Sequence, residues 1–119
     1  MQVLQPLHTA ILVSDVVRAE VFYGKILGLE KVDRTLKYPG AWYQLGDYQI
    51  HLIEDKSLVY SLQNSEKWGR NPHFALRVDC LESAKQILLD NGYEVQMSAS
   101  GRAALFTRDP DGNVIELGE

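Results

Sequence analysis

Two stretches of the chain share one order of apolar and polar positions. Residues 8–13, HTAILV, alternate or run apolar as a strand does. A helix is predicted after them, because Ser14 and Asp15 can cap its start and apolar residues recur at helical spacing until Gly28. Turn residues and short apolar runs then predict three strands, at about 29–34, 40–45 and 48–54.

The second half of the chain repeats this order. A strand headed by His73 leads to a helix, which a capping box of Asp79 and Glu82 opens and Asn91-Gly92 ends. Three more strands are predicted at about 93–98, 102–107 and 113–118. Residues 55–71 show no sustained period and are interpreted as the linker between the halves.

One offset of 65 residues relates the two halves. It places His8 on His73 near the start of each half and His51 on Glu116 near the end, which indicates an ancient duplication. We therefore predict an α+β fold of two tandem βαβββ modules, 5–54 and 72–119, in one domain spanning 1–119.

Composition narrows the class of protein. The chain has 119 residues, 45% of them hydrophobic and 24% charged, as expected for one compact domain. It lacks both a membrane-length apolar run and a signal-peptide pattern, which favours a cytoplasmic location without membrane partners. A net charge of −4 without a basic cluster argues against nucleic acid. The lone Cys80 fits a reducing compartment, and packing is a simpler interpretation of it than a reactive thiol.

Four polar side chains are predicted on one face of the strands. Side chains alternate across a strand, and this parity places the three histidines, together with one carboxylate, opposite the apolar faces that the helices cover. A single buried histidine is more often a hydrogen-bonded core residue than a ligand, but here all three occupy duplicated positions. Imidazole and carboxylate donors suit Zn, Ni, Fe, Co or Mn. We therefore predict a divalent transition-metal site made by His8, His51, His73 and Glu116.

The sequence resembles the vicinal oxygen chelate superfamily, also called the glyoxalase/bleomycin resistance/dioxygenase superfamily. The resemblance covers nearly all of the chain and rests on the two His-headed strands, on FYGKILGLE (22–30) and on DPDGNVIEL (109–117). It implies two modules that close a barrel-like cavity around one divalent metal, often within a homodimer. It also implies the same four ligands.

The branches of the superfamily differ at His51. The resemblance implies a glutamate there in the glyoxalase I branch, which puts glyoxalase I activity in doubt. Epimerases tolerate a neutral ligand at that position, and extradiol dioxygenases use ligands matching His8, His73 and Glu116. The predicted function is therefore a metal-dependent lyase, isomerase/epimerase or dioxygenase that chelates a small substrate through two oxygens. A metal-free, bleomycin-resistance-type binding dimer is the alternative.

Further roles are predicted around the metal. Glu116 is expected to act first as a ligand, with a second role as catalytic base left open. Trp42 and Phe106 border the predicted cavity as an apolar wall for the substrate, although core packing would equally account for them. Arg77 shares parity with His73 and could anchor a substrate carboxylate or form a surface ion pair.

Overall fold

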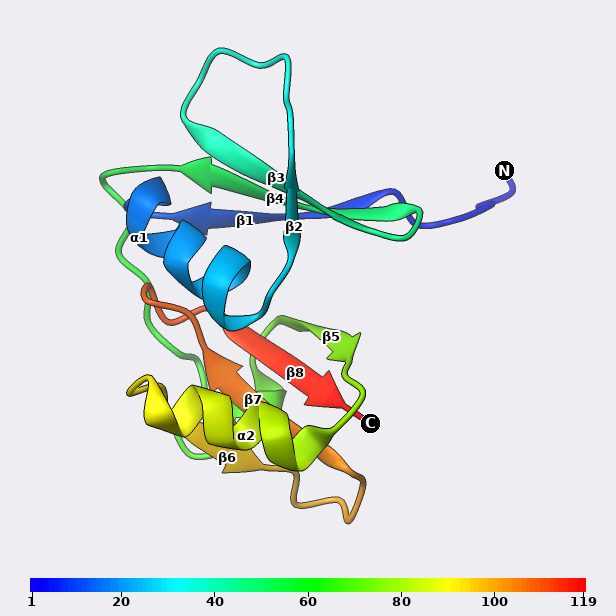
Figure 1. Cartoon of the computed structure of the whole chain (residues 1–119), viewed down its shortest axis with the longest axis vertical. Helices are drawn as coiled ribbons and strands as arrows, with labels where there is room; N and C mark the ends of the chain where they lie inside the picture. The colour runs from blue at the N-terminus through cyan, green and yellow to red at the C-terminus, as the bar shows by residue number, and fades with distance from the viewer. The chain divides into compact units, whose positions relative to one another are not determined.

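The computed structural model describes residues 1–119, and these form two compact units, Met1–Leu58 and Val59–Glu119. Each unit holds a four-stranded sheet with a helix on one face (Figure 1). The division falls inside the segment 55–71 that was predicted to link the halves. The α+β class and the two βαβββ modules are confirmed.

The first unit follows the predicted order of elements. It contains β1 (His8–Val13), α1 (Val16–Glu20), η1 (Val21–Ile26), β2 (Glu30–Val32), β3 (Gly40–Leu45) and β4 (Tyr48–Glu54). The sheet order is β1-β4-β3-β2, with β1 parallel to β4. Asp15 caps α1 as predicted, accepting a hydrogen bond from the Arg18 backbone N–H at 3.2 Å. The second half of the predicted helix, η1, is a π-helix, which the periodicity did not predict.

The second unit repeats the topology. It contains η2 (Trp68–Arg70), β5 (His73–Arg77), α2 (Leu81–Asp90), β6 (Val95–Met97), β7 (Ala104–Arg108) and β8 (Val114–Gly118). The sheet order β5-β8-β7-β6 matches that of the first unit strand for strand. As predicted, α2 ends before Asn91, and Gly92 follows with a positive φ of 81°.

The start of α2 differs from the prediction. Cys80, not Asp79, occupies the N-cap position, and its side chain makes no cap hydrogen bond. The Leu81 backbone N–H instead donates to the Glu119 carboxylate at 3.0 Å. In the first unit the Val16 backbone N–H donates to Glu54 at 2.9 Å, and Glu54 lies 65 residues before Glu119. Both modules therefore cap their helix with a carboxylate from the end of their last strand, a contact between distant residues that local patterns do not reveal.

Strand parity is confirmed by the burial of side chains. In β1, Ile11 and Val13 are buried whereas His8, Ala10 and Leu12 are exposed. The buried faces carry the helices: α1 packs on β3 and β4, and α2 packs on β6 and β7 (Figure 1). No helix in the structure is both long and apolar enough to span a bilayer.

Gly40 at the start of β3 is required by close packing. A β-carbon at this position would collide with the carbonyl oxygen of Leu52 on β4, which is backbone and cannot turn aside. We expect Gly40→Ala to lower the free energy of unfolding by about 1–3 kcal/mol, measured by urea denaturation. Gly118→Ala in β8 is the matched control, since its nearest neighbour would lie 3.8 Å away. Equal stability of the two variants would contradict the argument.

Candidate metal-binding site

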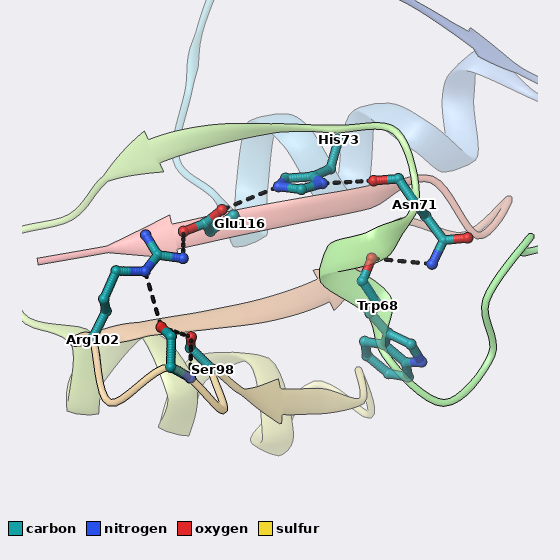
Figure 2. Close-up of polar contacts among 7 residues, drawn as sticks. Trp68, Asn71, His73, Ser98, Arg102 and Glu116 are labelled. Atoms are coloured by element: carbon teal, nitrogen blue, oxygen red, sulfur yellow. Dashed lines mark hydrogen bonds and ion pairs between the residues drawn. The ribbon is translucent and has the colours of Figure 1, made fainter.

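His73 and Glu116 form a pair on the helix-free face of the second sheet. β5 runs parallel to β8, with Ala75 opposite Glu116. His73 lies two residues before Ala75, so its side chain is on the same face of the sheet as that of Glu116. The His73 Nε2 atom lies 3.1 Å from Glu116 Oε2, and only 23% and 10% of the two side chains are exposed (Figure 2). The predicted proximity of these two residues is therefore observed.

The protonation of His73 is fixed by its other ring nitrogen. Nδ1 lies 2.7 Å from the backbone carbonyl oxygen of Asn71, and a carbonyl only accepts, so Nδ1 carries a hydrogen (Figure 2). In the neutral ring, Nε2 then presents a lone pair towards the Glu116 carboxylate. Either a second proton or a cation bound by both atoms has to lie between them.

The second carboxylate oxygen of Glu116 is held by Arg102. Arg102 Nη2 lies 3.0 Å from Oε1, and Arg102 Nε donates to the Ser100 hydroxyl at 3.1 Å. Figure 2 shows the guanidinium reaching Glu116 from the loop that joins β6 to β7. Sequence analysis gave Arg102 no role: it placed this residue at the start of a strand predicted at about 102–107, whereas β7 begins at Ala104 and Arg102 lies in the loop before it. It favoured Arg77 instead, which is exposed on β5.

In the first unit, His8 and His51 lie together on the equivalent face. Their rings stack with centroids 4.1 Å apart, and the Trp42 ring stacks on the other side of His51 at 4.3 Å. Trp42 is the cross-strand partner of His51, just as Phe106 is the partner of Glu116 in the second unit. Trp42 therefore holds the imidazole plane, a role that was not predicted for it.

A chain of side-chain amides fixes the hydrogen on His51. Gln44 Nε2 donates to the Gly46 carbonyl at 2.6 Å, so its Oε1 accepts from Gln49 Nε2 at 2.7 Å. Gln49 Oε1 then accepts from His51 Nε2 at 2.8 Å. Since Nε2 carries the hydrogen, Nδ1 is the nitrogen of His51 with a free lone pair.

The pKa of His51 lies below its usual value. Burial is the largest cause, and the positive charges of His8 and Arg34 lower this pKa further. Two guanidinium nitrogens of Arg34, Nε and Nη2, are buried without a hydrogen-bond partner, so this cation is not neutralised locally. His51 is thus kept in the neutral form that metal ligation requires.

Phe106 connects the His73–Glu116 pair to the core. Its ring meets the His73 ring edge-on at 5.4 Å, and it is 7% exposed in a cluster with Trp68 and Val114. Phe106 therefore packs in the core and also contacts a residue of the candidate site, and its role as a wall for the substrate stays a prediction.

The donors of the second unit suit a divalent transition metal. Bonds of about 2.0–2.2 Å at a right angle separate two ligand atoms by roughly 3.0 Å, and the observed separation of His73 Nε2 and Glu116 Oε2 is 3.1 Å. A ligand histidine usually donates its other N–H to a carbonyl or carboxylate, as His73 does to Asn71. In the first unit His51 likewise donates one ring N–H, to Gln49, and keeps the lone pair of Nδ1 for a ligand.

The four predicted ligands come together as two pairs. Within neither unit do three or more His, Cys, Asp or Glu side chains gather in a metal-binding group. The two pairs occupy equivalent positions in the register of their sheets. In the first unit His8 lies opposite Gln49 and His51 opposite Ala10. In the second unit His73 lies opposite Val114 and Glu116 opposite Ala75. A single site made by all four residues stays a prediction.

Cys80 lies outside this site. It is exposed at the N-cap of α2, so its interpretation as a packing residue was wrong. A hydrogen bond from the Ser83 hydroxyl, 3.3 Å from the sulfur, lowers the pKa of the thiol.

Comparison with known proteins agrees with this fold. The sequence matches the Glyoxalase/Bleomycin resistance protein/Dioxygenase superfamily over residues 5–117, and the chain belongs to this superfamily. It is 32% identical over 121 residues to the lactoylglutathione lyase of Escherichia coli O157:H7, covering 93% of this chain and 89% of that protein.

Solved structures share the fold. The lactoylglutathione lyase of Agrobacterium tumefaciens is similar with a TM-score of 0.70 at 24% identity, over 97% of this chain and 92% of that one. TnmS3, an antibiotic binding protein from Streptomyces sp. CB03234, is similar with a TM-score of 0.70 at 22% identity, over 99% and 97% of the two chains. The same fold thus occurs in a protein named as an enzyme and in one named as a binder.

Proposed function

We propose that this protein is a metal-dependent enzyme that binds a small substrate through two neighbouring oxygens. In this proposal the protein ligands are drawn from His8, His51, His73 and Glu116, and the divalent cation is Zn, Ni, Fe, Co or Mn. Such a cation polarises substrate oxygens and stabilises negative charge that develops on them. The proposal covers the lyase, isomerase/epimerase and dioxygenase reactions of the superfamily.

One observation carries the proposal. His73 Nδ1 is committed to the Asn71 carbonyl, which leaves the lone pair of Nε2 facing a carboxylate oxygen at 3.1 Å. With a neutral His73 ring, two acceptor atoms converge and a divalent cation between them would satisfy both, whereas a second proton on the ring would make the contact an ordinary ion pair. The site is also partly buried, which lowers the competition from water for both atoms.

Each candidate ligand is oriented by its own neighbouring residues. Arg102 holds Oε1 of Glu116 and leaves Oε2 towards His73, which favours ligation by Glu116 through this one oxygen. Gln49 and Trp42 hold the His51 ring in its plane and with one defined hydrogen. Glu116 as a catalytic base would first have to separate from Arg102, which makes the ligand role the simpler assignment.

The oligomer in this proposal is a homodimer in the cytoplasm. The helix-free face of the first sheet presents Leu12, 45% exposed, beside Ala10 and His8, and a second chain would cover such a face. Light scattering at micromolar concentration is expected to give twice the chain mass of 13.5 kDa. A monomer mass would count against it.

Chelating probes test the proposed function directly. We expect benzohydroxamate to bind the metal-loaded protein at least about 100-fold more tightly than the metal-stripped protein. The reason is that its two adjacent oxygens can bind a cation but have no such partner in the metal-free site. Isothermal titration calorimetry of both forms measures the difference. Equal affinities would instead support a metal-free binding protein. This alternative stays open because the candidate ligands form pairs and no three of them gather in one unit.

The reaction named for the relatives discriminates between branches. The glutathione hemithioacetal of methylglyoxal is expected to be a poor substrate, because His51 stands where the glyoxalase I branch has a carboxylate. We expect turnover of the metal-loaded protein to stay below about 10 per second, a typical enzyme value. His51→Glu is expected to raise this turnover, and an absorbance assay of product formation compares the two proteins. Efficient turnover by the unaltered protein would contradict the argument that a histidine at position 51 makes glyoxalase activity poor.

A further inference from the structure

A cavity of about 390 Å³ lies within the second unit, and Phe106, whose ring meets that of His73, is one of its lining residues. The lining comes from η2 and the two residues before it, from β6 and the loop after it, and from β7; the residues include Glu66, Lys67, Gly69, Arg70, Gln96, Met97 and Phe106. The volume is within the range of roughly 300–1,000 Å³ found for small-molecule sites. None of these residues was assigned a role from the sequence except Phe106.

The cavity is connected to the candidate site through Phe106. This ring lines the cavity and also meets the His73 ring edge-on, and its cross-strand partner is Glu116. Gly69 makes room for it, since a β-carbon there would lie 2.6 Å from Phe106 Cζ. A molecule that reaches the His73–Glu116 pair with two oxygens can therefore extend its apolar body against Phe106 and Met97.

Few polar groups of the cavity are available to a ligand. Gln96 is engaged, because its Oε1 accepts from the Trp68 backbone N–H at 2.9 Å and its Nε2 donates to the Glu66 carbonyl at 2.8 Å. The charged side chains of the lining are Lys67, Arg70 and Glu66, with a net charge of +1. Lys67, the N-cap of η2, and Arg70, its last residue, are exposed on either side of Trp68 and Gly69, so both can reach an anion at the mouth of the cavity.

We propose that the substrate carries a carboxylate remote from its two chelating oxygens, that its apolar body occupies this cavity, and that Lys67 and Arg70 bind the carboxylate. The inference rests on the proposed function, because the chelating end of the molecule is placed by the metal. It replaces Arg77, the anchor predicted from the sequence, with two cations that line an observed cavity.

Three hydroxamates of one shape test the inference: benzohydroxamate, its 4-carboxy derivative and its 4-aminomethyl derivative. Their dissociation constants are measured by calorimetry on zinc-loaded and metal-stripped protein. We expect the carboxylate to bind the loaded protein roughly 5- to 10-fold more tightly than the parent compound, and the amine more weakly than the parent. The preference should shrink as salt is raised, because both cations are exposed.

Variants assign the preference to residues. Lys67→Gln combined with Arg70→Gln should remove the preference for the carboxylate over benzohydroxamate, and because Glu66 remains in the lining the amine should no longer bind most weakly. The matched control is Lys25→Gln with Arg18→Gln, two exposed cations of the other unit, which should keep the full preference. Metal-dependent binding without any carboxylate preference, or a preference lost in Arg77→Gln instead, would overturn this inference alone. Equal binding of all probes to loaded and stripped protein would overturn the proposed function and this inference with it.

Discussion

Replacing His73 or Glu116 by alanine is expected to remove most of the divalent metal that the purified protein takes up. The unaltered chain should bind about one ion. Each substitution should weaken metal binding by roughly 100-fold or more, because loss of a residue that only hydrogen-bonds a ligand already costs about 10- to 100-fold. The reason is that each residue supplies one of two donor atoms separated by only 3.1 Å. Metal analysis after chelator treatment, reloading and dialysis gives the stoichiometry.

Two further variants make this result specific. Glu82→Gln removes an exposed carboxylate from α2 in the same unit and should leave metal uptake unchanged. Arg102→Gln frees Oε1 of Glu116 without removing a donor, so its effect should be smaller than that of Glu116→Ala. Full uptake by His73→Ala, or no uptake by the unaltered chain of Zn, Ni, Fe, Co or Mn, would contradict the metal site.

Asn71→Ala should be among the most destabilising single substitutions in the second unit. Asn71 is 4% exposed, and its side-chain oxygen accepts from the backbone N–H groups of Gln63 and Asn64 at 2.8 and 3.0 Å. Its side-chain nitrogen donates to the Asn64 and Trp68 carbonyls at 2.8 and 3.0 Å. Alanine leaves these backbone groups without their partner, at a cost of about 2–4 kcal/mol. Urea denaturation followed by tryptophan fluorescence measures the loss.

Asn71→Ala should also affect the metal-binding site. The carbonyl of Asn71 accepts from His73 Nδ1, so a loosened segment 63–71 should also weaken metal uptake. Asn91→Ala is the matched control: it is exposed, donates through its side chain only to the Ile87 carbonyl, and should cost about 1 kcal/mol or less. If Asn71→Ala were no more destabilising than Asn91→Ala, the network around Asn71 would not hold the segment.

The sequence predicted the features that depend on periodicity and duplication. Strand parity placed His8 with His51 and His73 with Glu116, because alternation across a strand is a local rule and the offset of 65 residues supplied the register. Contacts that depend on loops were not predicted. Arg102 reaches Glu116 from an aperiodic turn, and the carbonyl that orients His73 is backbone, which any residue at position 71 would provide.

Errors at the helices have a similar cause. Asp79 has the right residue type for a cap, but the cap of α2 comes from Glu119, which is distant in sequence and close only after β8 pairs with β5. The π-helical turn of η1 depends on packing around Phe22 and Tyr23, both fully buried, and spacing alone does not distinguish it from an α-helix. The role of Trp42 against His51 likewise follows from cross-strand pairing rather than from residue type.

The matching helix caps show which parts of the duplicated module were free to change. Glu54 and Glu119 keep the same contact in both copies, whereas three positions before each of them His51 and Glu116 differ in charge. Two identical modules would present identical donors. Once the copies are joined in one chain, each can diverge alone while its framework stays intact. One copy now pairs two imidazoles and the other pairs an imidazole with a carboxylate, so the donor atoms of one copy have changed without any change in the strand order or the helix cap that carry them.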